Sequence, residues 1–433
     1  MRSLCNRSMA ASTLKVPAAD GFVKPGFEHV QDVFRQTIEE GIERGGSFAA
    51  YFQGELVVNL WGGFADEEAR RPWKYNTASV FYSTTKSPSA VVIGHLVDRG
   101  YLDYEQPISR YWPEYGQNGK EKTTLKQLLS LKSGVPVLSD PFKLSLIRDD
   151  PQQLESILAQ QTPWKMGDEF YAYSPVAIGL YLDQIVRKVD PLKRNLSQYF
   201  QEEIAKPFGV DFHIGISKPA YWRVARPVVT VRGQAYKKYI QQMAANPDLD
   251  INLLLLSQSQ PIDFQRNSLI HDPDFMELPV GSTHGVGSAE GMAKLHGILA
   301  NGGLLRGQCL LSAQTLKLMQ TPLSMGTEKH FGQEMFYSYG MTLLPVLEGN
   351  EVKYNFGHGG FGGQFAASDV QHKTGWAYVT NYLDPTIMVT GNCKWQKLEE
   401  ALFKCVQKVK GINLPRKHIL SARDLQNTLK SSL

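Results

Sequence analysis

The stretch VFYSTTKSPSA, residues 80–90, joins an apolar segment to a run of helix-forming residues. Ser83 and Lys86 are three positions apart in it, so on a helix they lie one turn apart on the same face. A serine hydroxyl becomes a good nucleophile when a base removes its proton, and a lysine can act as that base if its surroundings lower its pKa. The simpler interpretation is two polar residues on a solvated face. The N–H groups free at a helix start, which stabilise negative charge, favour the nucleophile and its base.

The composition is that of a globular protein with a small-molecule partner. The 433 residues are 42% hydrophobic and 20% charged. The net charge of +4 comes from 46 basic and 42 acidic residues, which argues against nucleic acid as a partner. No run of 18 apolar residues occurs, so the sequence predicts no membrane span. It makes no prediction of oligomeric state.

The cysteines are sparse and show no pairing pattern. There are four of them, with neither a C-x-x-C pair nor a histidine cluster nearby: Cys5, Cys309, Cys393 and Cys405. This spacing predicts no disulfide framework and no metal site, and it favours a reducing, intracellular compartment, either the cytoplasm or mitochondria.

The two ends of the chain are predicted to lie outside the folded domain. Residues 1–25 carry Arg2, Arg7 and Lys15 and no acidic residue before Asp20, a composition that favours a disordered tail and also suits a mitochondrial targeting segment, the alternative. We expect one domain over residues 26–412 and a C-terminal tail over 413–433. Within the domain, the proline-rich residues 218–283 are predicted to form loops or a lid.

Hydrophobic periodicity predicts an α+β fold. Apolar residues recur every three or four positions over residues 27–45 and again over 393–411, which indicates amphipathic helices. The β-prone residues 47–63 contain a Gln-Gly-Glu turn and predict a hairpin, as do residues 362–383. The segments between them are mostly helical in pattern. One antiparallel sheet built from both termini, flanked by helices and carrying an all-helical lobe, would satisfy this order.

The sequence around Ser83 also resembles a known superfamily. LVVNLWGGFAD before it and HLVDRGYLDYEQPISRYWPEY after it, with TTLKQLLSLKSGVP further on, are similar to the serine β-lactamases and penicillin-binding proteins. The resemblance is closest to the esterase-like, β-lactamase-related branch. It implies the β-lactamase/transpeptidase-like fold, with the site between the sheet and the helical lobe. One departure is Leu131-Lys132, where the family usually has His-Thr.

The family's second motif, Y-x-N, corresponds to a tyrosine in MGDEFYAYSPVAIGLYLDQIVRKV, residues 166–189. Tyr173 aligns the helix that follows it, and Tyr171 is the alternative. With Tyr173 in place, the third position is Pro175, so an expected polar contact to the substrate is missing.

Two stretches compete for the third motif. Lys373-Thr374-Gly375 spells the K-T-G of β-lactamases, but its position between two strands predicts a hairpin turn. FGHGGFGGQFAASDV, residues 356–370, resembles the H-x-G version instead. His358 then takes the place of the lysine, and Gly359 and Gly360 let the backbone approach the substrate.

The resemblance implies a serine hydrolase that works through an acyl-enzyme and needs no metal or cofactor. Ser83 would attack a carbonyl, Lys86 would take its proton, and Tyr173 would relay protons to the leaving group. His358 would help position the substrate, and the backbone N–H groups of Ser83 and Phe361 would hold the oxyanion. Carboxylic esters or small amides are the expected substrates. The alternatives are β-lactamase or D,D-peptidase activity, and a non-catalytic protein that kept the fold.

Overall fold

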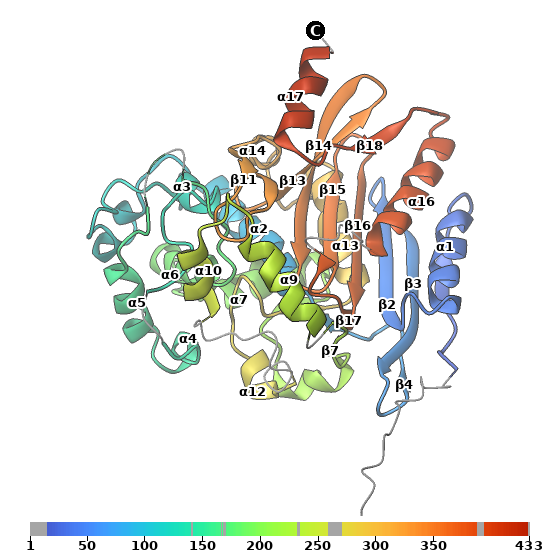
Figure 1. Cartoon of the computed structure of the whole chain (residues 1–433), viewed down its shortest axis with the longest axis horizontal. Helices are drawn as coiled ribbons and strands as arrows, with labels where there is room; N and C mark the ends of the chain where they lie inside the picture. The colour runs from blue at the N-terminus through green and yellow to red at the C-terminus, as the bar shows by residue number, and fades with distance from the viewer. Residues whose placement is uncertain are drawn as a thin grey trace, which may run out of the picture.

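A large antiparallel sheet organises the molecule (Figure 1). The computed structural model describes residues 15–139, 142–165, 167, 170–231, 234–258, 271–387 and 394–431. Over these residues the main path of the sheet runs β1 (Asp20–Val23), β3 (Glu55–Asp66), β2 (Gly45–Phe52), β16 (Thr374–Thr380), β15 (Gln364–Asp369), β14 (Glu351–Gly360), β13 (Thr342–Glu348), β12 (Glu334–Tyr337), β11 (Ser324–Thr327). The short strands β4 (Arg71–Pro72) and β18 (Arg416–His418) pair with β3 and β13. Because β2 pairs with β16, the sheet joins both ends of the chain, as predicted.

The central strands are buried on both faces, and their side chains alternate between two cores. In β2, Phe48, Ala50 and Phe52 pack into the core under two helices, whereas Ala49 and Tyr51 point into the core on the opposite side. The predicted hairpin between β2 and β3 turns at Gln53 and Gly54, whose φ angles of 53° and 82° suit a tight two-residue turn.

Helices cover both faces of the sheet. The helices α1 (Glu28–Glu39) and α16 (Lys394–Val409), drawn in blue and red in Figure 1, lie side by side on one face. On the other face α13 (Ala289–Ala300) lies against β2, β15 and β16. A Cβ on Gly375 of β16 would come within 2.1 Å of the α13 backbone, so glycine is required for this close packing.

A helical lobe, defined here as residues 125–208, packs beside the sheet (Figure 1). Its helices are α3 (Leu125–Leu129), α4 (Leu146–Asp149), α5 (Pro151–Gln160), α6 (Ala177–Val189), α7 (Leu196–Tyr199), the π-helix η4 (Phe200–Ala205) and α8 (Lys206–Phe208). A separate small sheet has the strand order β5 (Ser79–Val80), β8 (Gly285–Gly287), β6 (Phe212–Ile214). The remaining short elements are η2 (Ile108–Arg110), η3 (Pro113–Tyr115), β9 (Leu304–Leu305), β10 (Gln308–Cys309) and α14 (Ala313–Met319). The predicted α+β class with a helical lobe is confirmed.

Residues 218–283 hold more regular structure than the expected loops. They contain η5 (Lys218–Arg223), α9 (Gln234–Ala244), α10 (Ile251–Gln258) and α12 (Pro273–Met276), and β7 (Val228–Val229) pairs with β17 (Tyr382–Leu383). Pro219 and Pro273 stand in the first turns of η5 and α12, where a proline costs no hydrogen bond. These two prolines therefore begin helices and do not mark loops. Residues 259–270 of this segment lie outside the described part.

The two predicted tails also contribute to the fold. Residues 20–23 form β1 on the edge of the sheet, and residues 413–433 contain β18 and α17 (Ala422–Ser431). Arg416 of β18 forms ion pairs with Glu399 at 3.3 Å and with Asp369 at 3.7 Å. A three-residue strand held by charges has no apolar periodicity, so no pattern in the sequence predicts it. Among the described helices, none is both long and apolar enough to cross a bilayer.

Candidate active site

The predicted nucleophile lies on a strained turn between the small sheet and a helix. Residues Tyr82–Thr85 form the 3₁₀ turn η1, and the helix α2 (Lys86–Asp98) begins directly after it. Tyr82 has φ 47°, a left-handed conformation that is costly for a bulky residue. Thr85 Oγ1 accepts from the Gly285 backbone N–H at 2.8 Å, which ties the turn to β8. Because α2 begins at Lys86, Pro88 falls in its first turn, where an N–H is not needed.

Lys86 is held so that its amine reaches Ser83. Its Nζ lies 3.2 Å from Ser83 Oγ, 2.8 Å from the Pro175 carbonyl oxygen and 3.1 Å from the Ser282 carbonyl oxygen. A neutral amine has two N–H donors and one lone pair. When each N–H group donates to one of the two carbonyl oxygens, the lone pair points at the Ser83 hydroxyl and can accept its proton.

The surroundings of Lys86 favour the neutral amine. Lys86 is 3% exposed, and this burial alone lowers the pKa of its amine well below the usual 10.5. The Tyr173 ring, rather than a carboxylate, lies over it, with Nζ 4.9 Å from the ring centroid. Ser83 itself is only partly buried. The geometry thus combines a buried amine with a serine hydroxyl that remains accessible.

Of the two candidate tyrosines, Tyr173 is the one beside Ser83. Burial raises the pKa of Tyr173 above the usual 10, and a hydrogen bond between its hydroxyl and the Ser83 side chain offsets part of this rise. The Tyr171 hydroxyl is buried and has no hydrogen-bond partner among the described residues. Pro175, in the third position of the motif, contributes its carbonyl to Lys86.

His358 joins this group from β14, but both of its ring nitrogens are already engaged. Nδ1 lies 2.5 Å from the Gly359 carbonyl oxygen, so Nδ1 carries the hydrogen, and Nε2 accepts from the Tyr337 hydroxyl at 3.0 Å. Burial, followed by the nearby Lys86, lowers the pKa of His358 to about 3. A neutral imidazole at this position adds no positive charge that would oppose proton uptake by Lys86.

The end of β14 packs directly against the nucleophile turn. A Cβ on Gly360 would meet the Phe81 carbonyl oxygen at 2.3 Å and Thr84 Oγ1 at 2.8 Å, whereas one on Gly359 would meet nothing closer than 3.8 Å. The ring of Phe361 lies against Tyr82, with centroids 5.5 Å apart. Phe361, predicted to share the oxyanion site with Ser83, therefore follows a strand end that touches η1.

Lys373 lies where the hairpin interpretation put it. It is exposed, has φ 50°, and stands in the turn between β15 and β16. His358 pairs with Ala366 near the start of β15, so the length of β15 separates it from this turn.

Three residues that support the candidate site could not be identified from the sequence. Tyr337 donates to His358 from β12, and Glu328 and His330 bond the Tyr173 backbone. Glu328 and His330 are more than 150 residues from Tyr173 in the chain, and Tyr337 and His358 lie on separate strands. No motif spacing connects these pairs. Among the described residues, no cluster of three or more His, Cys, Asp or Glu side chains could hold a metal ion.

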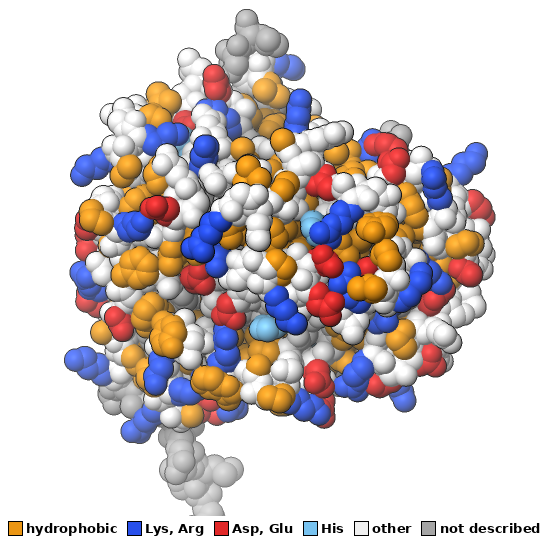
Figure 2. Space-filling view, turned by 180° about the vertical axis from the view of Figure 1, so that it is seen from behind, with side chains coloured by type: hydrophobic (Ala, Val, Ile, Leu, Met, Phe, Trp, Pro, Cys, Tyr) orange, Lys and Arg blue, Asp and Glu red, His pale blue; other side chains and the backbone are white. Residues whose placement is uncertain are grey.

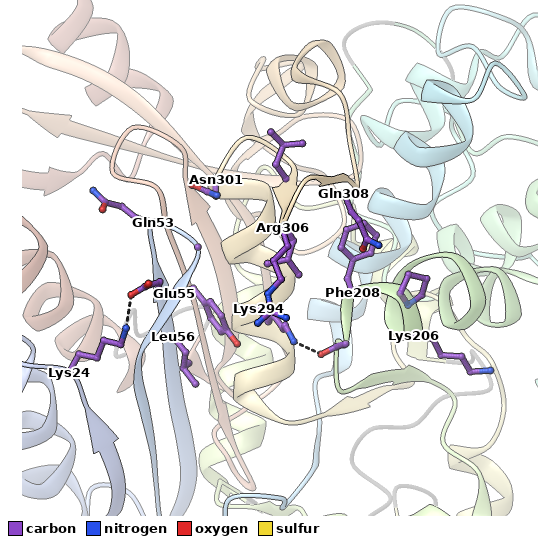
Figure 3. A pocket seen from close by; sticks show the side chains of 16 residues that line it. Lys24, Gln53, Glu55, Leu56, Lys206, Phe208, Lys294, Asn301, Arg306 and Gln308 are labelled. Atoms are coloured by element: carbon purple, nitrogen blue, oxygen red, sulfur yellow. Dashed lines mark hydrogen bonds and ion pairs between the residues drawn. The ribbon is translucent and has the colours of Figure 1, made fainter.

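A large pocket elsewhere does not contain the candidate site. It measures about 910 Å³ and lies between the β2–β3 hairpin, α8, α13 and the β9–β10 hairpin (Figure 3). Basic side chains line it, including Lys206, Lys294 and Arg306, and Lys294 donates to the Gly209 carbonyl. None of the four predicted catalytic side chains is among its lining residues, so pocket size does not identify the active site.

Comparison with protein families identifies the chain. The family model described as Beta-lactamase matches residues 30–391, which include the Ser83 turn, the lobe and β14. The chain belongs to the beta-lactamase family. The predicted superfamily resemblance is confirmed.

Two of the proteins similar to this beta-lactamase family member are described as esterases. Esterase/beta-lactamase LipL of Mycobacterium tuberculosis is 32% identical over 196 residues, which cover 45% of this chain and 44% of LipL. The chain thus matches less than half the length of this relative. The crystal structure of a family VIII carboxylesterase has a TM-score of 0.79 and 30% identity, and the match covers 89% of this chain and 99% of that one. A penicillin-binding protein homologue from Caulobacter crescentus has a TM-score of 0.75 and 28% identity, covering 89% and 99%.

Proposed function

We propose that this protein is a serine hydrolase that cleaves carboxylic esters, or small amides, through an acyl-enzyme on Ser83. The observation that carries the proposal is the position of the Lys86 amine. It is buried, it contacts two backbone carbonyl oxygens, and its Nζ lies 3.2 Å from Ser83 Oγ. The esterase descriptions of LipL and of the family VIII carboxylesterase structure support the ester substrate.

In the proposed mechanism Ser83 Oγ attacks the substrate carbonyl while its proton passes to Lys86 Nζ. The backbone N–H groups of Ser83 and Phe361 stabilise the oxyanion. The proton then reaches the leaving group through the Tyr173 hydroxyl, which bonds Ser83. The leaving group departs, and water attacks the acyl-enzyme along the same path in reverse. Neutral His358 keeps the charge beside Lys86 low.

β-Lactam hydrolysis is the second candidate, because LipL carries both descriptions and a Beta-lactamase of Escherichia coli is 24% identical over 196 residues. Pro175 argues against it, since the motif's asparagine side chain, which would orient the amide of a lactam, is absent. D,D-peptidase activity is disfavoured for the same reason. A non-catalytic role is disfavoured because Ser83, Lys86, Tyr173 and His358 are all present together.

The proposal includes a small-molecule partner in an intracellular compartment, the cytoplasm or mitochondria. The two described cysteines, Cys309 and Cys405, are free thiols, which suits a reducing environment. Acidic and basic side chains are interspersed on the face shown in Figure 2, as expected for a protein without a nucleic-acid partner.

Hydrolysis of p-nitrophenyl butyrate and of nitrocefin tests the substrate class. An activated ester asks little of the proton relay, so we expect its kcat/KM to exceed that of nitrocefin at least about tenfold, or ~1.4 kcal/mol in transition-state stabilisation. Faster nitrocefin turnover would favour the lactamase. Turnover of neither substrate, with no covalent labelling of Ser83, would favour the non-catalytic protein.

A further inference from the structure

A buried carboxylate holds the Tyr173 backbone from a distant part of the chain. Glu328 follows β11 and is 0% exposed. Its Oε2 accepts the backbone N–H of Tyr173 at 2.8 Å and of His330 at 2.9 Å. Its Oε1 accepts the N–H of Phe331 at 2.7 Å and of Gln333 at 3.3 Å. Burying a carboxylate costs several kcal/mol unless hydrogen bonds replace its water, and here four N–H groups do so.

The same loop holds Tyr173 at two further points. His330 Nδ1 lies 2.8 Å from the Tyr173 carbonyl oxygen, and because a carbonyl only accepts, Nδ1 is the donor. Burial lowers the pKa of His330 to about 4, so this donor is a neutral imidazole. The Phe331 ring packs on the Tyr173 ring, with centroids 5.8 Å apart. The backbone N–H, the carbonyl and one ring face of Tyr173 are all contacted by residues 328–331.

Tyr173 needs such support because its own segment is irregular. Residues 170–174 form neither helix nor strand, and α6 begins only at Ala177. No ladder of backbone hydrogen bonds therefore fixes the position of the phenol. A shift of about 1 Å in a group that transfers a proton can cost on the order of a hundredfold in rate.

We propose that Glu328, assisted by His330, is a positioning residue of the hydrolytic site, which fixes the Tyr173 backbone so that its hydroxyl can pass a proton between Ser83 and the leaving group. The inference rests on the proposed function, in which Tyr173 is the relay. The competing explanation is that the loop only stabilises the fold.

Leaving-group dependence separates these two roles. In Glu328→Gln the side chain keeps its shape, but its NH₂ group faces two backbone N–H groups. Two of the four hydrogen bonds that Glu328 accepts are therefore lost. Proton delivery matters more for a poor leaving group, so kcat/KM for ethyl butyrate should fall about tenfold more than kcat/KM for p-nitrophenyl butyrate. Tyr173→Phe should show the same selectivity. The double variant should lose no more kcat/KM than Tyr173→Phe alone, because both changes impair the same proton relay.

A matched control and a second variant guard against simple unfolding. Glu348 is also a buried carboxylate, accepting from Gln407 and His372 at the far end of β13, so Glu348→Gln should lower the Tm but leave the ratio between the two esters unchanged. His330→Leu removes the carbonyl donor without touching Glu328, and His330→Asn, whose amide N–H can replace Nδ1, should restore at least half of the lost selectivity.

Each outcome decides between the explanations. Equal losses on both esters in Glu328→Gln and His330→Leu, or losses that add to those of Tyr173→Phe, would overturn the positioning role. If Tyr173→Phe itself showed no preference for the activated ester while Ser83 still reacted, the relay in the proposed function would be wrong, and the positioning role with it.

Discussion

The Lys86 amine decides whether the Ser-x-x-Lys spacing is chemistry or coincidence. Spacing alone places the two residues on one turn, but only the structure shows that burial lowers the pKa of Lys86 and that two backbone carbonyls hold its amine beside Ser83. The carbonyls come from residues 89 and 196 positions away. No local pattern could have predicted them.

Replacing Lys86 by arginine should remove the base. A guanidinium stays protonated near neutral pH, so kcat should fall roughly a thousandfold or more, about 4 kcal/mol of barrier. Near-normal turnover by Lys86→Arg would rule out Lys86 as the base.

The pH dependence of the wild-type protein should report the same group. The base acts only when neutral, and burial lowers its pKa, so kcat/KM should rise with pH and level off well below pH 10.5. A rate that still rises through pH 10.5 would contradict a buried, neutral Lys86.

His358 and Lys373 give opposite predictions for the third motif. His358→Ala should lower kcat/KM for p-nitrophenyl butyrate at least about tenfold, ~1.4 kcal/mol. The substitution removes the imidazole that accepts a hydrogen bond from Tyr337 and packs beside the Tyr173 ring. Lys373→Ala should leave kcat/KM nearly unchanged, because Lys373 is exposed in a distant turn. The reverse ranking would show that the K-T-G stretch is the functional one.

At the scale of elements, the site depends on how closely β14 approaches the turn η1. Both elements could be located from the sequence, β14 by the resemblance of its glycines and η1 by the Ser-x-x-Lys pattern. Their packing could not, because the contact between Gly360 and the Phe81 carbonyl joins residues far apart in the chain. The glycines were predicted to admit substrate, whereas Gly360 is required by the adjacent turn.

Gly360→Ala should therefore disturb both stability and the nucleophile. Its Cβ would clash with the Phe81 carbonyl oxygen at 2.3 Å, so we expect a loss of about 1–3 kcal/mol in the free energy of unfolding and slower covalent labelling of Ser83. Urea denaturation measures the first effect. Gly359→Ala is the matched control and should change the free energy of unfolding by less than about 0.5 kcal/mol, since its Cβ has room. Equal effects of the two substitutions would contradict the packing described here.

At the scale of the molecule, sequence periodicity predicted the layers well and the closing contacts poorly. The β-prone residues of β2 and β3 and the apolar stripes of α1 and α16 indicate a sheet with helices on it, because a helix that packs on a sheet buries side chains at regular intervals. The strand β18 has no such pattern. It is held by Arg416 against Glu399 and Asp369, and these charges are visible only once the chain is folded.

Arg416→Ala should destabilise the whole fold. It leaves the buried Glu399 and Asp369 without this partner, a change that typically costs about 3–5 kcal/mol. Lys404→Ala, which removes an exposed ion pair with Glu400, should cost less than about 0.5 kcal/mol. Similar urea midpoints for the two variants would show that the C-terminal segment is the dispensable tail that the sequence suggested.

Covalent labelling of Ser83 tests the central claim most directly. A fluorophosphonate probe reacts with an activated serine, and mass mapping of the labelled peptides locates the adduct. We predict labelling of Ser83 in the wild-type protein and none in Ser83→Ala, which keeps the surrounding turn. Labelling that persists in Ser83→Ala, or a folded wild-type protein that the probe does not label, would contradict the assignment of Ser83 as the nucleophile.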